Sequence, residues 1–572
     1  MGVSHLHHRT ARQTARLRQI VVVSVICLAI YCFLLVPEES LDSSRSTNPE
    51  AYQSQQRQRQ RQREGEGYHT LPPELLNNRF LTEDQCRATF PGLLEQVDNE
   101  VAKGPFKLER SPGNLGPLIA RIRDGQLYIL SAARKGDLSR DMLSHRSATL
   151  HQISNALLTW PRPSSSSSSP FSHIPDTIFA FNHHDDPIAS TMSYSRPADP
   201  ALLVTEDGGT KRFFPIPHFS FYAWPLPFIG SLPRAARAIT TIESTLPFAS
   251  KIPRAVWRGT TWFNNARAGR LRQNLVRAFG TSESSLGTDP GAKKWADIEA
   301  LDWSNNGGKG GGGGGGERNA SNALPIEDFC RYRYIIHTEG VTYSGRFQFH
   351  NLCASVVITP PVAWVQHVTH LLRPVFSYAL DPDAPDTLPS SPSSSSSSSR
   401  LSFRSLSSLF AADSQSQPQP QPQRQKQKKK KEEEREEPPK PQSGGLPRNP
   451  ISLGDREKPP PLSPYPAPWV RSAWPTSYSA ASEANIVFVA PDWSDLEATV
   501  SWLEAHPGIA AGIARRQRAL FEGGGYLSPA AETCYWRGLI RGWSEIVRVD
   551  EGVFDDLEEV TWEEFSLKEI HK

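Results

Sequence analysis

The sequence has little cysteine, little net charge and a modest share of apolar residues. Its 572 residues include 6 cysteines, and 63 basic against 60 acidic side chains leave a formal charge of +3. This balance gives no reason to expect a nucleic-acid partner, because domains that bind nucleic acids carry a basic excess. No Cys-x-x-Cys pair occurs, so the sequence offers no typical zinc site. Hydrophobic residues make up only 37%, and low-complexity runs interrupt the chain throughout.

One uncharged apolar run, Ile20 to Val36, lies near the N-terminus, with four arginines before it and acidic residues after it. A run of this length can just span a bilayer, and the positive-inside rule keeps its Arg-rich side in the cytosol. We therefore predict a cytosolic tail at 1–19 and a single-pass type II anchor at 20–36. The remaining chain would lie in the lumen of the endoplasmic reticulum or Golgi. A cleaved signal peptide is the alternative, although no small-x-small cleavage site follows the run.

Three further segments have compositions that cannot form a packed core. Residues 37–72 are Gln/Arg-rich and predict a disordered stem. Residues 304–322 form a Gly-rich insert, and residues 381–484 form a long insert of Ser, Gln-Pro, Lys and Glu runs. The first insert holds the sequon Asn319-Ala-Ser, which predicts a glycan on Asn319 in a lumenal protein.

Outside these segments, short apolar runs alternate with helical patterns, which predicts an α/β protein. Four cysteines lie beyond the apolar run: Cys86, Cys330, Cys353 and Cys534. They could form disulfides in an oxidising compartment, and the sequence does not choose among the three possible pairings. Near the C-terminus, an apolar stripe of Tyr535, Leu539, Trp543 and Ile546 has a spacing near four, which predicts a helix face buried in the core.

The segment from Tyr334 to Phe349 carries the most chemistry. A predicted buried strand, Tyr334 to Thr338, leads into a Gly-flanked turn with Ser344, Gly345 and Arg346. In α/β sheets, ligands bind at the carboxyl ends of the strands. Glycine permits close approach of the backbone, serine offers a hydroxyl, and arginine offers a planar fork of donors that matches phosphate. The local pattern is compatible with a site for a phosphorylated ligand and, equally, with a surface arginine in an ordinary loop.

This segment resembles the donor-binding signature of glycosyltransferase family 90, which includes fungal capsule-associated proteins, β-xylosyltransferases and animal protein O-glucosyltransferases. Further segments resemble family motifs in the same order: Phe181–Pro187, Arg254–Thr260 with Arg267 downstream, Ala363–Pro374, and Asp492–Leu539. The resemblance implies two Rossmann-like domains that face each other across a cleft, the GT-B arrangement. Residues 73–245 would form the acceptor-side domain, and residues 246–380 with 485–550 would form the donor-binding domain.

By the same resemblance, Asp185 in Asn182-His-His-Asp-Asp-Pro187 would be the catalytic base of an inverting sugar transfer. The donor would be UDP-xylose or UDP-glucose, the acceptor would be a glycan or glycoprotein, and no metal or other cofactor would be needed. The implied donor-binding residues are Arg258, Gly259, Thr260, Arg267, Ser344, Gly345, Arg346 and Phe347.

Alternative interpretations start from the same residues. His183, His184, Asp185 and Asp186 could be metal ligands, but adjacent residues of an extended segment point to opposite sides. Asp381-Pro-Asp383 has the Asp-x-Asp pattern of metal-dependent transferases, but no predicted strand precedes it. Departures from the family pattern, such as Thr260 in place of Ser, favour a second hypothesis, a catalytically degenerate protein that binds glycans or nucleotide sugars. A purely structural membrane protein would not explain the ordered motifs.

Overall fold

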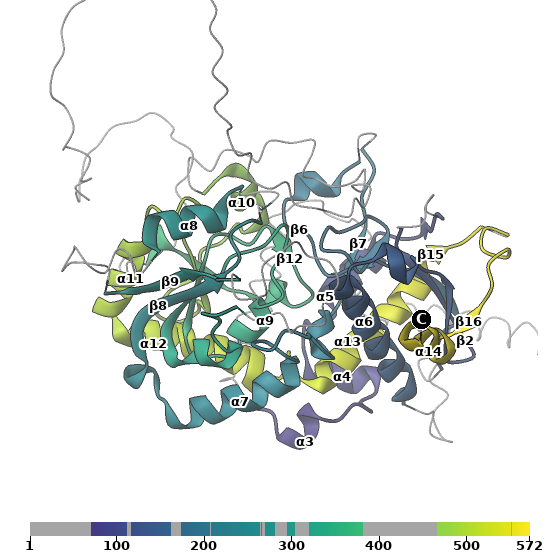
Figure 1. The fold of residues 1–572 in the computed structure, drawn as a ribbon, viewed down its shortest axis with the longest axis horizontal. Coiled ribbons are helices and arrows are strands. Elements are labelled where there is room, and N and C mark those ends of the chain that lie inside the picture. Colours follow the sequence, from purple (N-terminus) through teal and green to yellow (C-terminus); the bar gives the residue numbers. More distant parts are fainter. Residues whose placement is uncertain are drawn as a thin grey trace, which may run out of the picture. The chain divides into compact units, whose positions relative to one another are not determined.

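Two six-stranded sheets organise the part of the chain that the structure describes (Figure 1). This computed structural model describes residues 70–110, 116–161, 173–205, 208–263, 265, 269–280, 294–303, 320–380, 466–550 and 552–571. These residues all belong to one unit, Tyr68–Lys572. The predicted tail and anchor lie outside the described residues, as do nearly all of the stem, most of both inserts, and Arg267 and Asn319.

The second sheet along the chain is entirely parallel, as predicted for alternating strands and helices. Its order is β13-β14-β11-β10-β8-β9, and every neighbouring pair is parallel. β11 is fully buried and consists mainly of Val and Ile, and the last three residues of β10 are buried, which is typical of a parallel sheet covered on both faces. The strands are β8 (Ile252–Gly259), β9 (Ala296–Ala300), β10 (Tyr332–Ile336), β11 (Val356–Thr359), β13 (Pro374–Phe376) and β14 (Ile486–Phe488).

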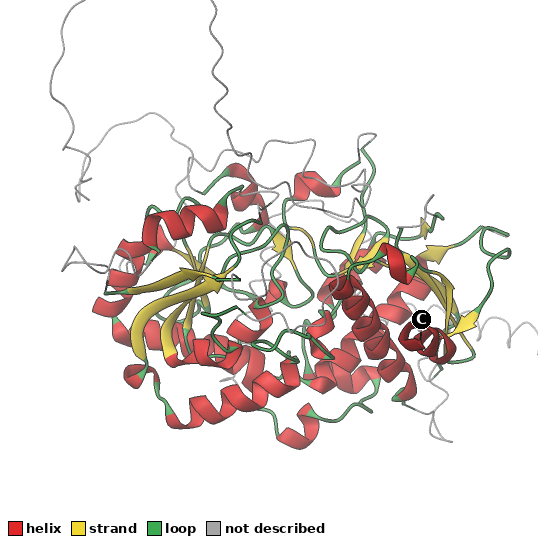
Figure 2. Cartoon of the chain, in the orientation of Figure 1, coloured by secondary structure: helices red, strands yellow, loops and turns green. Residues whose placement is uncertain are grey.

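Helices accompany this sheet on both sides (Figure 2). α12 (Pro507–Arg518) packs on β11 and β14, and α11 (Leu496–Ala505) packs on α12. α8 (Leu271–Phe279) contacts β9, and α7 (Leu232–Thr245) contacts the short α9 (Phe347–His350). β10 begins and ends two residues earlier than the predicted strand, so the turn with the candidate donor residues starts directly at the edge of the sheet.

The first sheet along the chain is mixed, and the parallel pairing expected of a Rossmann-like domain at 73–245 is found only from β4 to β7. In the order β16-β3-β2-β4-β5-β7, the pairs from β16 to β4 are antiparallel and the pairs from β4 to β7 are parallel. The reason is a tight hairpin at Asp124-Gly125, where both residues have positive φ angles of 50° and 74°. An Asp-Gly pair favours such a type I′ turn. The strands are β2 (Leu118–Arg123), β3 (Gln126–Ser131), β4 (Thr177–Phe181), β5 (Thr191–Ser193), β7 (Phe213–Pro215) and β16 (Val560–Thr561).

The C-terminal helix α13 (Pro529–Ile546) returns the chain to the first sheet. It packs against α5 (Glu95–Ala102), α6 (Arg140–Leu158), the short α4 (Glu83–Thr89) and α3 (Pro73–Leu76), and β4 (Figure 1). Its predicted apolar stripe is confirmed as core, since Tyr535, Leu539 and Trp543 have no exposed surface. The predicted donor-binding domain included all of 485–550, and α13 from that range packs on elements of the first half of the chain. β16 adds an edge strand to the first sheet by pairing with β3, and α14 (Trp562–His571) contacts β3 and β16.

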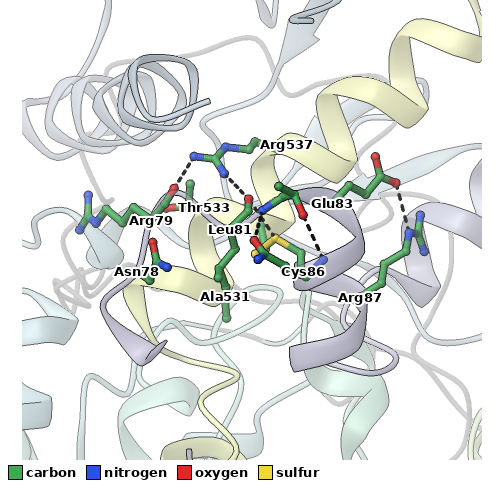
Figure 3. The surroundings of a disulfide bond; sticks show 12 residues. Asn78, Arg79, Leu81, Glu83, Cys86, Arg87, Ala531, Thr533 and Arg537 are labelled. Carbon is green, nitrogen blue, oxygen red and sulfur yellow. Dashed lines mark hydrogen bonds and ion pairs between the residues drawn. A yellow bond between two sulfur atoms is a disulfide. The ribbon is translucent and has the colours of Figure 1, made fainter. Parts of the chain in front are cut away.

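A disulfide joins α13 to α4 through Cys534 and Cys86 (Figure 3). Nearby, Arg537 of α13 donates to the backbone oxygens of Arg79 and Leu81, the latter at 2.9 Å. A second disulfide joins Cys330 to Cys353. It closes the 23-residue stretch that contains β10 and the candidate donor turn. The structure thus selects one of the three pairings that the sequence left open.

The long insert predicted at 381–484 extends too far at its carboxyl end. Residues 466–484 are described and include α10 (Pro468–Ala473), where Val470 is buried. Trp474 donates its indole N–H to the Val362 carbonyl oxygen at 2.9 Å, and Arg516 donates to the carbonyl oxygen of Ala484 at 2.8 Å. Residues 466–484 are therefore attached to the described core by burial of Val470 and by these hydrogen bonds.

No helix between Thr70 and His571, within the described ranges, is long and apolar enough to cross a bilayer. The predicted anchor at 20–36 precedes those ranges.

Candidate active site

The second sheet has a topological switch point between β8 and β10. From β8 the chain passes to β9 on one side, and from β10 it passes to β11 on the other. In open parallel sheets, ligands bind outside the carboxyl ends of the strands at such a point. Gly259 ends β8 with Thr260 directly after it, and the segment from His337 to Arg346 follows β10. The sequence-predicted donor residues that the structure describes therefore follow the two strands on either side of the switch point.

The side chains after β8 are largely engaged with the protein itself. The Arg258 guanidinium forms ion pairs with Asp297 at 2.7 Å and Glu299 at 3.3 Å, both from β9. Thr260 accepts a hydrogen bond on its hydroxyl from Arg272 at 3.2 Å. Gly259 lies against the Trp257 ring, and a Cβ on that residue would meet the ring at 2.6 Å. These residues shape the end of β8, and the charge of Arg258 is already neutralised by two carboxylates.

Arg272, in the first turn of α8, joins the ends of β8 and β10. Its guanidinium donates to the Glu339 carbonyl oxygen at 3.0 Å and to the Thr260 carbonyl oxygen at 3.2 Å. Burial and the nearby charge of Arg346 together lower the pKa of Arg272 to about 9, against the opposing effect of Asp185 and Glu339. No motif in the sequence pointed to this residue. The sequence contained one signal: a positive charge is unfavourable at the N-terminus of a helix, so an arginine at that position suggests a role other than stabilising the helix.

Glu339 is a buried carboxylate that holds the next loop. Its Oε1 accepts from the backbone N–H of Trp364 at 2.9 Å and of Ala363 at 3.1 Å. Trp364 begins β12 (Trp364–Val365), which pairs with β6 (Arg196–Pro197) from the first half of the chain. Burial raises the pKa of Glu339 to about 8, although the two amides and Asn265 oppose this shift. Glu339 thus links the end of β10 to a ladder that joins the two halves.

The predicted donor turn packs closely on the first half of the chain. A Cβ on Gly345 would lie 2.3 Å from Nε2 of His218, so the glycine is required there. The predicted close approach was to a ligand, and the close neighbour in the structure is a histidine of the protein. Arg346 donates to the Arg258 carbonyl oxygen, and burial lowers its pKa to about 10, which leaves it charged at neutral pH. Ser344 and Phe347 are buried beside it.

Asp185 lies in the loop that follows β4 of the first sheet. Asn182, which has no exposed surface, fixes that loop because its amide donates to the Asp186 carbonyl oxygen at 2.7 Å. From the second half, the Thr342 hydroxyl donates to the Asp185 carbonyl oxygen at 2.8 Å. The candidate base and the turn that carries Arg346 therefore come together, although they follow strands of different sheets.

Asp185 is exposed as a residue, but enough protein surrounds its carboxylate to desolvate it. Desolvation raises its pKa to about 6, and the charge of Asp186 adds to this effect. A hydrogen bond from Tyr343 and the charge of Arg272 lower the pKa. A carboxylate with this pKa is ionised at neutral pH and can accept a proton.

Residues 168–382 match the family model of glycosyl transferase family 90. The chain contains a glycosyl transferase family 90 domain. Asp185, Arg258, Gly259, Thr260 and the Ser344–Phe347 turn all lie inside the matched range. The domain supports glycosyl transfer as the reaction class and implies binding of a sugar donor and an acceptor. No curated protein matches the chain.

Within this family 90 domain, His183 and His184 lie beside the candidate base. His183 is buried against Phe181 and His184, and desolvation holds its pKa well below the usual value. Among the described residues, the three-ligand group that could hold an ion is Glu243 with Cys330 and Cys353, whose sulfurs form a disulfide. The ligand atoms of His183, His184, Asp185 and Asp186 do not form such a group there. Asp381-Pro-Asp383 lies outside the described residues.

Proposed function

We propose that the protein is an inverting glycosyltransferase that moves xylose or glucose from a UDP-sugar to a hydroxyl of a glycan or glycoprotein. The observation that carries this proposal is the meeting of Asp185 with the donor turn, through the 2.8 Å hydrogen bond from Thr342 to the Asp185 carbonyl oxygen. An inverting transfer needs one base on the acceptor side and cations on the leaving-group side. Asp185 and Arg346 provide this pair.

In the proposed reaction, the acceptor oxygen attacks the anomeric carbon and its proton passes to the Asp185 carboxylate. The bond between the anomeric carbon and the phosphate oxygen breaks on the opposite face, and UDP leaves with that electron pair. Arg346 donates to a backbone carbonyl oxygen, which leaves its charge without a carboxylate partner in that contact. It would stabilise the leaving phosphates. Arg272 would add positive charge between Arg346 and Asp185. The mechanism uses no metal.

Arg346→Ala is expected to weaken UDP binding by about 1.5–3 kcal/mol, because it removes a charge-assisted bond to phosphate. Arg346→Lys should restore only part of the affinity, since a point charge does not replace the guanidinium fork. Titration calorimetry with UDP measures both. Arg333→Ala is the matched control: Arg333 lies in β10 but pairs with Glu504, so its loss should leave UDP affinity unchanged. Equal affinity in wild type and both Arg346 variants would remove Arg346 from the donor site.

The full chain should release UDP from UDP-xylose or UDP-glucose, and release should increase when a suitable glycan acceptor is added. A coupled UDP assay with each donor, with and without acceptors, tests this expectation. Product stereochemistry by NMR then tests inversion at the anomeric carbon. A chain that binds UDP but transfers neither sugar would contradict the proposed enzyme activity.

A catalytically degenerate binding protein is the second candidate. The observation that favours it is the ion-pairing of Arg258 with Asp297 and Glu299, which leaves less free positive charge beside the donor turn. Retained UDP binding without turnover would support this candidate.

The proposed cellular setting is the membrane of the Golgi or endoplasmic reticulum, with a type II anchor at 20–36 and the domain in the lumen. Two disulfides support it, because such bonds persist in oxidising compartments.

The proposed arrangement of the two sheets is GT-B, with acceptor and donor sides meeting at Asp185. The parallel second sheet and its switch point support this arrangement.

A further inference from the structure

Two exposed aromatic side chains lie in the loop that follows β8. Trp262 is 61% exposed and Phe263 is 38% exposed, although large aromatic side chains contribute most to stability when they are buried. The Trp262 ring lies 5.9 Å from the Phe263 ring and 6.3 Å from the Trp303 ring, measured between centroids. Trp303 is half-buried and lies beside Phe228 at 6.2 Å. Trp262, Phe263 and Trp303 together are called the aromatic platform below.

Hydrogen bonds anchor the chain before and after the two exposed rings. Before them, Thr260 accepts a hydrogen bond on its hydroxyl from Arg272 at 3.2 Å. The Arg272 guanidinium also lies over the Phe263 ring, 5.7 Å from its centroid. After them, the buried Asn265 donates from its side-chain amide to the Gly340 carbonyl oxygen at 3.2 Å. The rings are therefore exposed to solvent between two anchor points, where burial does not explain their presence.

The same anchors belong to the candidate active site. Arg272 donates to the Glu339 carbonyl oxygen after β10 at 3.0 Å. Asn265 also donates to the Thr342 carbonyl oxygen at 3.4 Å, and the Thr342 hydroxyl donates to the Asp185 carbonyl oxygen at 2.8 Å. A short series of contacts thus connects the aromatic platform to the loop of the candidate base, where the acceptor would react.

We propose that the aromatic platform binds a neutral pyranose ring of a glycan acceptor, at a position along the glycan chain outside the sugar that reacts. This inference rests on the proposed function and names its acceptor as an oligosaccharide or polysaccharide chain. The C–H groups on one face of a pyranose are apolar and slightly positive, and the face of an aromatic ring is slightly negative. The two faces therefore attract each other and exclude water when they stack.

The openness of the platform favours a glycan chain over the base of UDP. Small ligands usually bind in clefts that cover most of their surface. An indole with 61% of its surface exposed covers a ligand from one side only. The neighbouring Trp303 adds a second ring at 6.3 Å, which matches successive sugars of an extended chain better than a single planar base.

Trp262→Ala tests the proposal, because it removes the most exposed ring and leaves Phe263 beside Arg272. The KM for a glycan acceptor should rise about 3- to 10-fold, the range for one lost aromatic stacking contact, and the effect should lie in KM and not in kcat. Trp262→Phe should restore part of the affinity. Phe80→Ala is the matched control: Phe80 is 62% exposed and lies between α3 and α4, so its loss should leave the acceptor KM unchanged.

Binding to a printed array of neutral oligosaccharides does not require turnover. The full chain should bind at least one pyranose oligosaccharide on the array. Calorimetry with that oligosaccharide should then show a Kd about 3- to 10-fold higher for Trp262→Ala, whereas the Kd for UDP should match that of the wild type. Unchanged glycan affinity in Trp262→Ala would overturn the proposal, as would a wild type that binds no glycan on the array. Weaker UDP binding in Trp262→Ala would assign the platform to the nucleotide base and would also overturn it.

The platform and the proposed function fail in different ways. A wild type that binds the oligosaccharide through Trp262 but transfers no sugar would reject the proposed function and keep the platform. Sugar transfer with the same acceptor KM in the wild type and in Trp262→Ala would keep the proposed function and reject the platform.

Discussion

Asp185→Asn is expected to lower turnover by about 10²–10⁴-fold while UDP affinity stays close to that of the wild type. The substitution keeps the shape of the side chain and removes its ability to accept a proton. The Asp185 contact that binds the donor turn uses the backbone oxygen, which remains in the variant. Donor binding should therefore survive. Steady-state kinetics with the preferred UDP-sugar and calorimetry with UDP provide the two measurements.

Asp186→Asn is the matched control for this prediction. Asp186 is adjacent to the base, and its own carbonyl oxygen accepts from Asn182. The Asp186→Asn variant should lose far less turnover than Asp185→Asn. The pKa of Asp185 should fall in this variant, because a neighbouring negative charge is removed. Loss of UDP binding together with activity in Asp185→Asn would indicate a structural role instead. Equal damage from both variants would point back to a shared metal site.

Replacing both Cys86 and Cys534 with Ser should lower the free energy of unfolding by about 2–5 kcal/mol. The bond joins α4 to α13 across 448 residues of sequence, so it strongly restricts the unfolded chain. Arg537 beside it would remain bonded to the backbone of residues 79 and 81, and the local fold should persist (Figure 3). Denaturant unfolding followed by tryptophan fluorescence measures the change.

The second disulfide is the natural comparison. Cys330 and Cys353 are separated by only 23 residues, and on the chain-entropy model the difference in loop length corresponds to about 2–3 kcal/mol. The double Ser variant at these two positions should therefore lose less stability. A larger loss of stability in the Cys330/Cys353 variant would mean that this disulfide contributes through the packing around the donor turn. The chain-entropy explanation would then be wrong for this protein.

Local sequence patterns predicted the parts of the site that depend on local geometry. β4 and the loop at Asp185 were predicted because an apolar run ends where polar residues begin. Gly345 was predicted to allow a close approach, and His218 makes that approach. Arg346 was predicted to lie beyond the carboxyl end of its strand because strand, turn and helix are consecutive in the sequence, and it follows β10.

The remaining features depend on contacts between distant segments, which no local pattern encodes. Thr342 bonds to the backbone of Asp185, 157 positions earlier, and Arg272 bonds to a backbone oxygen after β10. The stripe on α13 predicted a buried face, yet nothing in its spacing says which sheet buries it. The Asp124-Gly125 turn is different, because that pair is a readable hairpin signal whose use would have predicted the antiparallel half of the first sheet.

The order of strands in the second sheet has a consequence for recombinant fragments. β14, which comes from residues beyond the family match, lies between β13 and β11. A fragment cut at residue 382 would lose an interior strand and leave β13 without its neighbour, and it would also lack the helix that buries one side of the first sheet. Its exposed strand edges would favour aggregation. The matched range is thus a unit of sequence similarity and not a unit of folding, and expression of the sugar-transfer domain should retain the chain through α14.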